Sequence, residues 1–180
     1  MKLENKVAIV TGGSRGIGYA TVEKFIKEGA KVCLTASSEA SAEKAVGKLK
    51  EAYPNADIMG IAPTLSSLES VQAEFAKVVE KYGRIDILVN NAGMSESTPL
   101  SAYTEELYDK VIDLNVKGVF TCSKVAADYM EKQHSGVIIN ASSIVSITGQ
   151  PAGFAYPASK FAVNGMTLSM ARELGPKGIR

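Results

Sequence analysis

The chain has 180 residues, of which 46% are hydrophobic and 22% are charged, proportions typical of one globular domain with a sizeable core. Its formal net charge is +1, and the sequence contains no basic tract, which argues against a nucleic-acid partner. No apolar run has the length of a membrane span or of a signal-peptide core, so we expect a soluble, cytoplasmic protein.

Few side chains are suited to metal or disulfide chemistry. Cys33 falls in an apolar, strand-like run and Cys122 in a helical one, so we expect two reduced thiols and neither a disulfide nor a metal site. His134 is the only histidine and lies in a Lys-Gln-His-Ser-Gly turn, where we expect it to be exposed. A Ser-His-Asp hydrolase and a histidine-rich metal site are therefore poor alternatives.

Short apolar runs alternate with segments of helical period along the whole chain. The runs predicted as strands are Val7–Val10, Lys31–Leu34, Asp57–Ile61, Ile85–Asn90 and Val137–Ala141. They are continuously apolar, as the strands of a parallel sheet covered on both faces must be. We predict an α/β fold with a doubly wound parallel sheet, and, since no repeat or linker divides the chain, one domain over residues 1–180.

The helical segments carry start and stop signals. The first is predicted over about Gly16–Glu28 and stops at Gly29, a residue type that favours the left-handed position after a helix. Another opens with Ser66, paired with Glu69 as a capping box, and ends near Gly83. The remaining signals are Thr104 as a helix cap, a helical pattern from about Asn115 to Lys132, and a last helix from about Tyr156 to Leu174.

A glycine-rich turn, Thr11-Gly12-Gly13-Ser14-Arg15-Gly16-Ile17-Gly18, joins the first strand to the first helix. Backbone N–H groups and the positive end of a helix meet there, as they do where a dinucleotide pyrophosphate binds. Gly12 suits the tight turn, Gly16 leaves room for phosphate oxygens, and Gly18 allows close packing of helix on strand. The spacing differs from the standard G-x-G-x-x-G, and an ordinary glycine-rich turn remains the alternative.

The end of the second strand bears on the choice of cofactor. An acidic residue there would bind the adenosine ribose and repel a 2′-phosphate. This chain has Leu34-Thr35-Ala36-Ser37-Ser38, with Glu39 slightly late, so we expect Ser37 to face the cofactor without that repulsion. Arg15 could reach a 2′-phosphate as a charge-assisted donor, and we expect Ser14 and Ile17 of the same turn to contact the cofactor. The sequence favours NADP(H) over NAD(H), although Arg15 could also be an ordinary solvated side chain.

Tyr156 and Lys160 stand four residues apart on the last predicted helix, so their side chains lie on one face. A tyrosine with an ordinary pKa of about 10 is a poor base at neutral pH, and a nearby ammonium favours the phenolate. The pair could therefore exchange a proton with a carbonyl or an alcohol. By itself, such a pair also occurs by chance on amphipathic helices.

Several motifs occur together and in a characteristic order. They are the glycine-rich turn, Asn90-Asn91-Ala92-Gly93, Asn115 within Asp113-Leu114-Asn115-Val116, Ser142-Ser143, and Tyr156-x-x-x-Lys160. From Lys6 to Arg180 the chain thus resembles the short-chain dehydrogenase/reductase family. The resemblance implies a Rossmann-type fold and an oxidoreductase that moves a hydride between NAD(P) and a small-molecule ketone or secondary alcohol.

The resemblance also implies residue roles. Tyr156 would be the proton donor or acceptor, and Lys160 would bind the nicotinamide ribose and ease ionisation of the tyrosine. Ser143, in preference to Ser142, would hydrogen-bond the reacting oxygen, and Asn115 would hold a water that links Lys160 to solvent. Taken singly, Ser143 could be a simple cap and Asn115 a helix-start residue.

Further cofactor contacts follow from the same resemblance. Asn90, Ala92 and Gly93 would line the cofactor and brace the sheet beneath it. After the third strand the family usually has an Asp that contacts the adenine, whereas this chain has Thr64, which could still accept a hydrogen bond. Residues expected to border the substrate are Met94, Ser95, Val145, Gln150 and Phe154. This mostly apolar set favours an alicyclic, acyl or steroid-like ketone.

The chain is similar to 3-oxoacyl-acyl-carrier-protein reductase, glucose dehydrogenase and hydroxysteroid dehydrogenase members of the family. It stops at Arg180, where the family's next strand, substrate lid and final strand would follow, so we expect an incomplete domain with Val137–Ala141 as an uncovered sheet edge. Family members usually form homodimers or homotetramers, which we expect here too. The alternative is a catalytically silent, truncated module that binds a dinucleotide or forms an oligomer.

Overall fold

Five short strands form one parallel sheet in the computed structural model, which describes residues 1–180. They are β1 (Val7–Val10), β2 (Lys31–Thr35), β3 (Ile58–Ile61), β4 (Ile87–Asn90) and β5 (Val137–Asn140). Their order in the sheet is β3-β2-β1-β4-β5, and every neighbouring pair is parallel. The order reverses between β1 and β4, so this α/β fold has its topological switch point there, as the doubly wound prediction requires.

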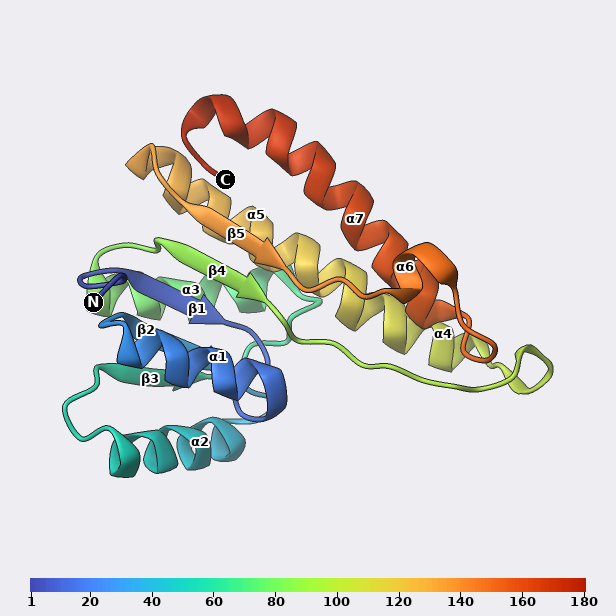
Figure 1. Ribbon diagram of the computed structural model, residues 1–180, viewed down its shortest axis with the longest axis horizontal. Helices are drawn as coiled ribbons and strands as arrows, with labels where there is room; N and C mark the ends of the chain where they lie inside the picture. Colours follow the sequence, from blue (N-terminus) through green and yellow to red (C-terminus); the bar gives the residue numbers. More distant parts are fainter.

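Helices connect the strands and cover the sheet (Figure 1). They are α1 (Gly16–Lys27), α2 (Glu39–Ala52), α3 (Leu68–Tyr82), α4 (Glu105–Ile112), α5 (Gly118–Gln133), α6 (Val145–Thr148) and α7 (Ala155–Leu174). Short 3-10 turns occupy Leu100–Ala102 and Gly175–Lys177, and a π-helical turn occupies Asp113–Lys117. None of the helices has both the length and the apolar character needed to cross a membrane.

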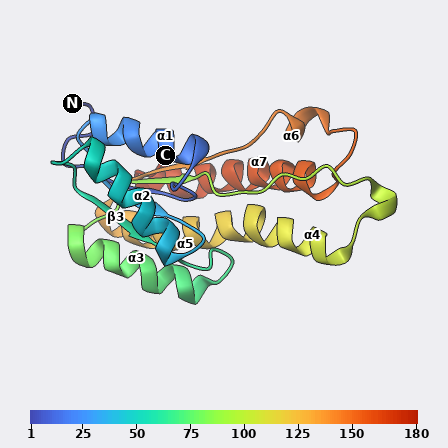
Figure 2. The same cartoon turned by 90° about the horizontal axis from the view of Figure 1, so that it is seen from below.

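Two apolar clusters form the core, one on each face of the sheet. Successive residues of a strand point to opposite faces, so Val7 and Ile9 of β1 join the cluster under α3 and α5. Ala8 and Val10 join the other cluster, under α1 and α2. Figure 2 shows α1 on one side of the sheet and α3 and α5 on the other. The double coverage explains why these strands are apolar without alternation.

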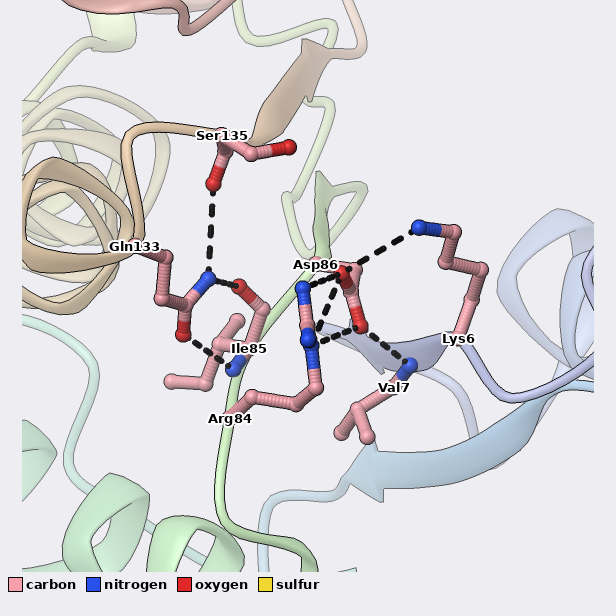
Figure 3. A network of polar contacts seen from close by, with 7 residues as sticks. All are labelled: Lys6, Val7, Arg84, Ile85, Asp86, Gln133 and Ser135. Carbon is pink, nitrogen blue, oxygen red and sulfur yellow. Dashed lines mark hydrogen bonds and ion pairs between the residues drawn. The ribbon is translucent and has the colours of Figure 1, made fainter.

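Hydrogen bonds at the amino ends of the adjacent strands β1 and β4 connect the two strands (Figure 3). Asp86, only 4% exposed, accepts the N–H of Val7 at 2.9 Å and pairs with the Arg84 guanidinium at 2.7 Å. Beside it, the Gln133 amide accepts the N–H of Ile85 at 3.1 Å and donates to its carbonyl at 2.8 Å. These contacts leave the opposite, carboxyl ends of the strands free to form a site.

The boundaries of α3 and α5 differ from those predicted. Ser67 caps α3 by accepting the N–H of Ser70 at 3.3 Å, so the predicted cap Ser66 is wrong by one residue, because the helix begins at Leu68. Asn115 does not begin a helix. The run that starts at Glu105 passes through the π-helical turn at Asp113–Lys117 into α5, and the backbone stays in the right-handed helical region at both junctions.

Other boundary signals are confirmed. Thr104 caps α4 by accepting the N–H of Leu107 at 3.2 Å, and Gly83 ends α3 in the left-handed conformation. His134 ends α5 and is exposed. Separately from these boundaries, the thiols of Cys33 and Cys122 are buried and free. The short helix α6 was not predicted, since four residues carry no detectable period.

Strand β5 forms an edge of the sheet. It pairs with β4 along its length and is the last strand in the sheet order, as predicted, and Ile139 on it is 47% exposed. A short stretch of the last residues begins to pair with its other side: Arg180 accepts the N–H of Ile138 at 2.8 Å and donates to Gly136 at 3.0 Å. The edge is therefore partly occupied by the chain itself.

Candidate active site

A cavity of about 580 Å³ opens at the carboxyl ends of the strands, at the switch point between β1 and β4. Among the predicted cofactor residues, those that line it are Gly12, Ser14, Arg15, Gly16, Ile17, Ser37, Ala92 and Gly93. It is also lined by Thr35, Ala36, Ser41, Pro63, Leu65, Asn91 and Leu114, which were not predicted. We call it the glycine-loop cavity.

The start of α1 lies at this cavity with its backbone N–H groups free. Its N-cap residue, Arg15, makes no side-chain capping bond, and the first turn contains no acid. By contrast, α2, α3 and α4 are capped by Ser38, Ser67 and Thr104. An uncapped helix start with unopposed positive dipole is suited to an anionic group such as a pyrophosphate.

Two glycines of the turn serve different purposes. Gly16 has a φ of +56°, and a side chain there would point into open space, so the position gives the backbone a left-handed turn beside the cavity. Gly18 is buried, and a β-carbon there would overlap the carbonyl oxygen of Gly12 and the side-chain amide of Asn91. Gly18 does not line the cavity; it permits the close contact of α1 with the ends of β1 and β4.

Thr11 and Asn91 join the ends of β1 and β4 beneath the cavity. The Thr11 hydroxyl accepts the N–H groups of Asn91 and Ala92, each at 3.0 Å. The Asn91 amide donates to the Thr11 carbonyl at 3.0 Å. Neither residue was predicted to have a role, although Thr11 stands in the glycine-rich turn and Asn91 in the Asn90-Asn91-Ala92-Gly93 motif. A threonine directly before the first glycine was the available signal.

Asn90 lies under the site, away from the cavity lining. It is 3% exposed, and its amide donates to Ser123 at 2.9 Å and to Asn140 at 2.8 Å. Asn140 in turn donates to Thr167 at 2.9 Å. This chain of bonds connects β4 with β5, α5 and α7, and so fixes the strand ends that carry the site.

Lys160 is buried, with 6% exposure, and its ammonium donates to the Ala141 carbonyl at 2.7 Å. The ammonium nitrogen lies 5.7 Å from the centre of the Tyr156 ring. A β-carbon built on Gly93 would lie 3.9 Å from the same nitrogen, so Lys160 stands directly behind the cavity wall. Burial lowers the pKa of Lys160 from its ordinary value.

Asn115 is fully buried inside the π-helical turn. Its amide nitrogen donates to the Met94 carbonyl at 2.8 Å and to the Ser159 hydroxyl at 3.0 Å, and its oxygen accepts the Met94 N–H at 2.9 Å. Ser159 donates to the Tyr156 carbonyl at 2.7 Å. Because both N–H groups of the amide are used, a water held by Asn115 would have to donate to one of its oxygen atoms.

The segment after β5 brings the two candidate serines to α7. Ser142 donates to the Lys160 carbonyl at 3.4 Å, and Ser143 accepts the N–H of Val145 at 3.4 Å. The Ser143 carbonyl accepts the buried Ser146 hydroxyl at 2.6 Å. Asn164 donates to the same Ser146 hydroxyl at 2.9 Å, so the backbone of Ser143 is held from two elements.

Thr64 lies outside the cavity lining. Its side chain is exposed and its N–H donates to Ser70 at 2.9 Å, while its neighbours Pro63 and Leu65 line the cavity. Gln150, predicted to border the substrate, donates to backbone carbonyls of its own loop and of the loop after β4.

The family model for short chain dehydrogenases matches residues 6–180. This chain belongs to that family. A 3alpha-hydroxysteroid dehydrogenase from Mediterraneibacter gnavus is 55% identical over 180 residues, covering 100% of this chain and 72% of the relative. A 3-oxoacyl-[acyl-carrier-protein] reductase from Thermotoga maritima is 41% identical over 180 residues, with the same coverage of 100% and 72%. The predicted resemblance is confirmed.

Solved structures agree with this assignment. An NAD+-bound xylitol dehydrogenase superposes with a TM-score of 0.94 at 31% identity, covering 100% of this chain and 69% of that one. A levodione reductase superposes with a TM-score of 0.93 at 33% identity, covering 99% and 69%. The Rossmann-type fold is therefore confirmed, and the protein is an oxidoreductase of a family that uses NAD(P) and acts on CH–OH and C=O groups.

Proposed function

We propose that this protein transfers a hydride between NADP(H) and the carbon of a ketone or secondary alcohol, with Tyr156 as general acid or base. One observation carries the proposal: the ammonium of Lys160 stands behind the Gly93 wall of the glycine-loop cavity and 5.7 Å from the Tyr156 ring centre. The proton-transfer pair thus adjoins a cavity suited to a dinucleotide.

Each of the four proposed catalytic residues has a separate role in the hydride and proton transfer. The nicotinamide, when bound, supplies or accepts the hydride. In reduction the Tyr156 hydroxyl donates its proton to the carbonyl oxygen, and in oxidation the phenolate accepts the proton of the alcohol. The Ser143 hydroxyl donates a hydrogen bond to the same oxygen, and the Lys160 ammonium binds the nicotinamide ribose. An Asn115-bound water returns protons between Lys160 and solvent.

The preference for NADP(H) is supported by the residues beside α2. Arg15, Ser37 and Ser41 line the cavity there, and no Asp or Glu does. Glu39, the acid nearest in sequence, is exposed in the first turn of α2. An arginine with serine hydroxyls suits a 2′-phosphate, whereas a carboxylate would repel it.

The substrate we propose is a ring-bearing, steroid-like ketone or alcohol. Apolar side chains are exposed around α6 and the start of α7: Ile144 is 70%, Ile147 75% and Phe154 55% exposed. The Phe154 ring lies 6.3 Å from the rings of Tyr103 and Tyr108. The 55% identity to a 3alpha-hydroxysteroid dehydrogenase, against 41% to the carrier-protein reductase, supports the same class.

A homodimer or homotetramer remains our proposal for the assembly. The outer faces of α5 and α7 expose Phe120 at 53%, Phe161 at 52% and Leu168 at 69%. Large exposed apolar side chains on neighbouring helices are typical of an interface. Sedimentation velocity would measure the assembly, and a monomer at micromolar concentration would contradict it.

Calorimetric titration with NADPH and with NADH, followed by assays with 3-ketosteroids, simple cyclic ketones and acyl thioesters, tests the proposed function. We expect tighter binding of NADPH and turnover of a cyclic ketone. Binding without any turnover would favour the catalytically silent module instead. Failure to bind either nucleotide would contradict both functions.

A further inference from the structure

The first turn of α7 is held by side chains from a distant loop. Phe154, the residue before the helix, makes no side-chain capping bond. Instead, the Glu96 carboxylate accepts the N–H of Tyr156 at 3.3 Å, from 60 positions earlier in the chain. The Tyr103 hydroxyl accepts the N–H of Ala155, also at 3.3 Å and from 52 positions earlier. Two N–H groups that a helix start leaves without partners are thereby satisfied.

Glu96 also ties together the two loops that flank Tyr156. Its second carboxylate oxygen accepts the N–H of Thr98 at 3.0 Å, and its backbone carbonyl accepts the Gln150 amide at 2.9 Å. The N–H of Gly153 donates to the Thr98 carbonyl at 2.9 Å. We call Glu96, Thr98, Gln150 and Gly153 the Glu96 latch. Figure 1 shows the long segment after β4 reaching the start of α7.

The same segment is anchored a second time, close to the Glu96 latch. Two residues before Glu96, both backbone groups of Met94 bond to the buried Asn115 amide, at 2.8 and 2.9 Å. Asn115 also holds Ser159 of α7. The loop is therefore fixed between the π-helical turn and α7. This restricts the position of Glu96, which lies two residues after Met94.

We propose that Glu96 is a positioning residue that keeps Tyr156 in place relative to Lys160, an inference that rests on the proposed role of Tyr156. Tyr156 is the second residue of α7, where an uncapped helix frays. Lys160 lies one turn farther along and is held separately by the Ala141 carbonyl. Fraying of the first turn would therefore move Tyr156 and leave Lys160 in place, which would separate the pair.

The charge of Glu96 suits this position. A carboxylate is a stronger acceptor than an amide, and it is favoured at a helix N-terminus by the helix dipole. The first turn of α7 contains no acid of its own. Glu96 supplies the missing negative charge from outside the helix.

Three variants test the proposal: Glu96→Ala removes the acceptor, Glu96→Gln keeps an acceptor oxygen without the charge, and Glu105→Ala removes a matched carboxylate from the exposed first turn of α4. The readouts are hydrogen exchange of the Tyr156 amide by NMR, kcat and KM for the ketone, and the Kd for NADPH. The exchange measurement needs neither cofactor nor turnover.

In Glu96→Ala we expect Tyr156 amide exchange to accelerate about tenfold or more, because the only partner of that N–H is gone. We expect kcat to fall by about 10- to 100-fold, as when a reacting group is displaced by about 1 Å, while the Kd for NADPH stays unchanged. Glu96→Gln should restore most of the slow Tyr156 amide exchange and most of kcat. Glu105→Ala should change neither the exchange rate nor kcat.

Two results would overturn the role of Glu96. One is wild-type exchange and kcat in Glu96→Ala. The other is a parallel loss of kcat, NADPH affinity and melting temperature, which would show general stabilisation. If Glu96→Ala does not fold, Tyr103→Phe replaces it, because it removes the acceptor of the neighbouring Ala155 N–H. Faster exchange of the Ala155 amide is then expected, and wild-type exchange there would overturn the idea that the distant loop holds the first turn of α7. A wild-type protein that turns over no ketone would refute the proposed function, while the exchange data still decide the latch.

Discussion

The ammonium nitrogen of Lys160 lies 5.7 Å from the centre of the Tyr156 ring, one turn away on the same face of α7, and adjoins the cavity wall at Gly93. The ammonium is buried and donates to one backbone carbonyl, that of Ala141. Burial without a carboxylate partner is unfavourable for a charged lysine, which is why its pKa is lowered. The protein therefore keeps a destabilised cation beside its proposed acid–base residue.

Replacing Lys160 by Met should separate activity from stability. We expect Lys160→Met to lose turnover while remaining at least as stable as the wild type near neutral pH, since an apolar side chain of similar length avoids the cost of a buried charge. Urea unfolding of the cofactor-free protein, with ketone assays beside it, measures both. A large loss of stability would mean that the lysine supports the fold.

The difference in stability between Lys160→Met and the wild type should depend on pH, and the direction of the change can be stated. Because the folded-state pKa of Lys160 is lowered, the unfolded chain binds more protons than the folded one between that pKa and the ordinary lysine value. Wild-type stability should rise with pH across this window. The advantage of Lys160→Met should be largest below it and shrink as the pH increases. A difference between the two proteins that does not vary with pH would contradict the burial argument.

Gly18→Ala should impair both folding and cofactor binding. The added methyl group would overlap the Gly12 carbonyl and the Asn91 amide, so we expect a loss of about 1–3 kcal/mol in the free energy of unfolding. Gly47→Ala is the matched control, because a β-carbon at this position in α2 meets nothing. It should be neutral or stabilise by up to about 1 kcal/mol. Equal effects of the two substitutions would argue against the close contact.

Arg15→Ala should weaken NADPH binding selectively. A charge-assisted bond to the 2′-phosphate contributes roughly 1.5–3 kcal/mol, so we expect about a tenfold or greater rise in the Kd for NADPH and little change for NADH. Arg172→Ala, at the exposed end of α7, serves as the control for loss of one positive charge. A similar loss of affinity for both nucleotides in Arg15→Ala would place that side chain at the pyrophosphate instead.

Local patterns in the sequence predicted the strands, the glycine turn and the Tyr156/Lys160 pair, because each depends on neighbouring residues. The cap of α3 was placed one residue early because Ser66 and Ser67 are both serines, and either residue can cap a helix. Thr64 was assigned to the adenine by its place in the chain, yet its side chain lies outside the cavity lining.

Contacts between residues far apart in the sequence could not be predicted. Asn115 was recognised by family resemblance, but its bonds to Met94 and Ser159 depend on a π-helical turn that has no clear pattern in sequence. Glu96 carries no local signal either, because its partner on α7 is 60 residues away. The proposed catalytic side chains were thus visible in the sequence, whereas the residues that hold them were not.

The most direct test of the proposed function compares Tyr156→Phe with the wild type, using NADPH and the best ketone of the panel. We expect kcat to fall by about 100- to 10,000-fold, the contribution of a general acid, while the Kd for NADPH and the melting temperature stay at wild-type values. Turnover by Tyr156→Phe at the wild-type rate would contradict the assignment of Tyr156 as the proton donor.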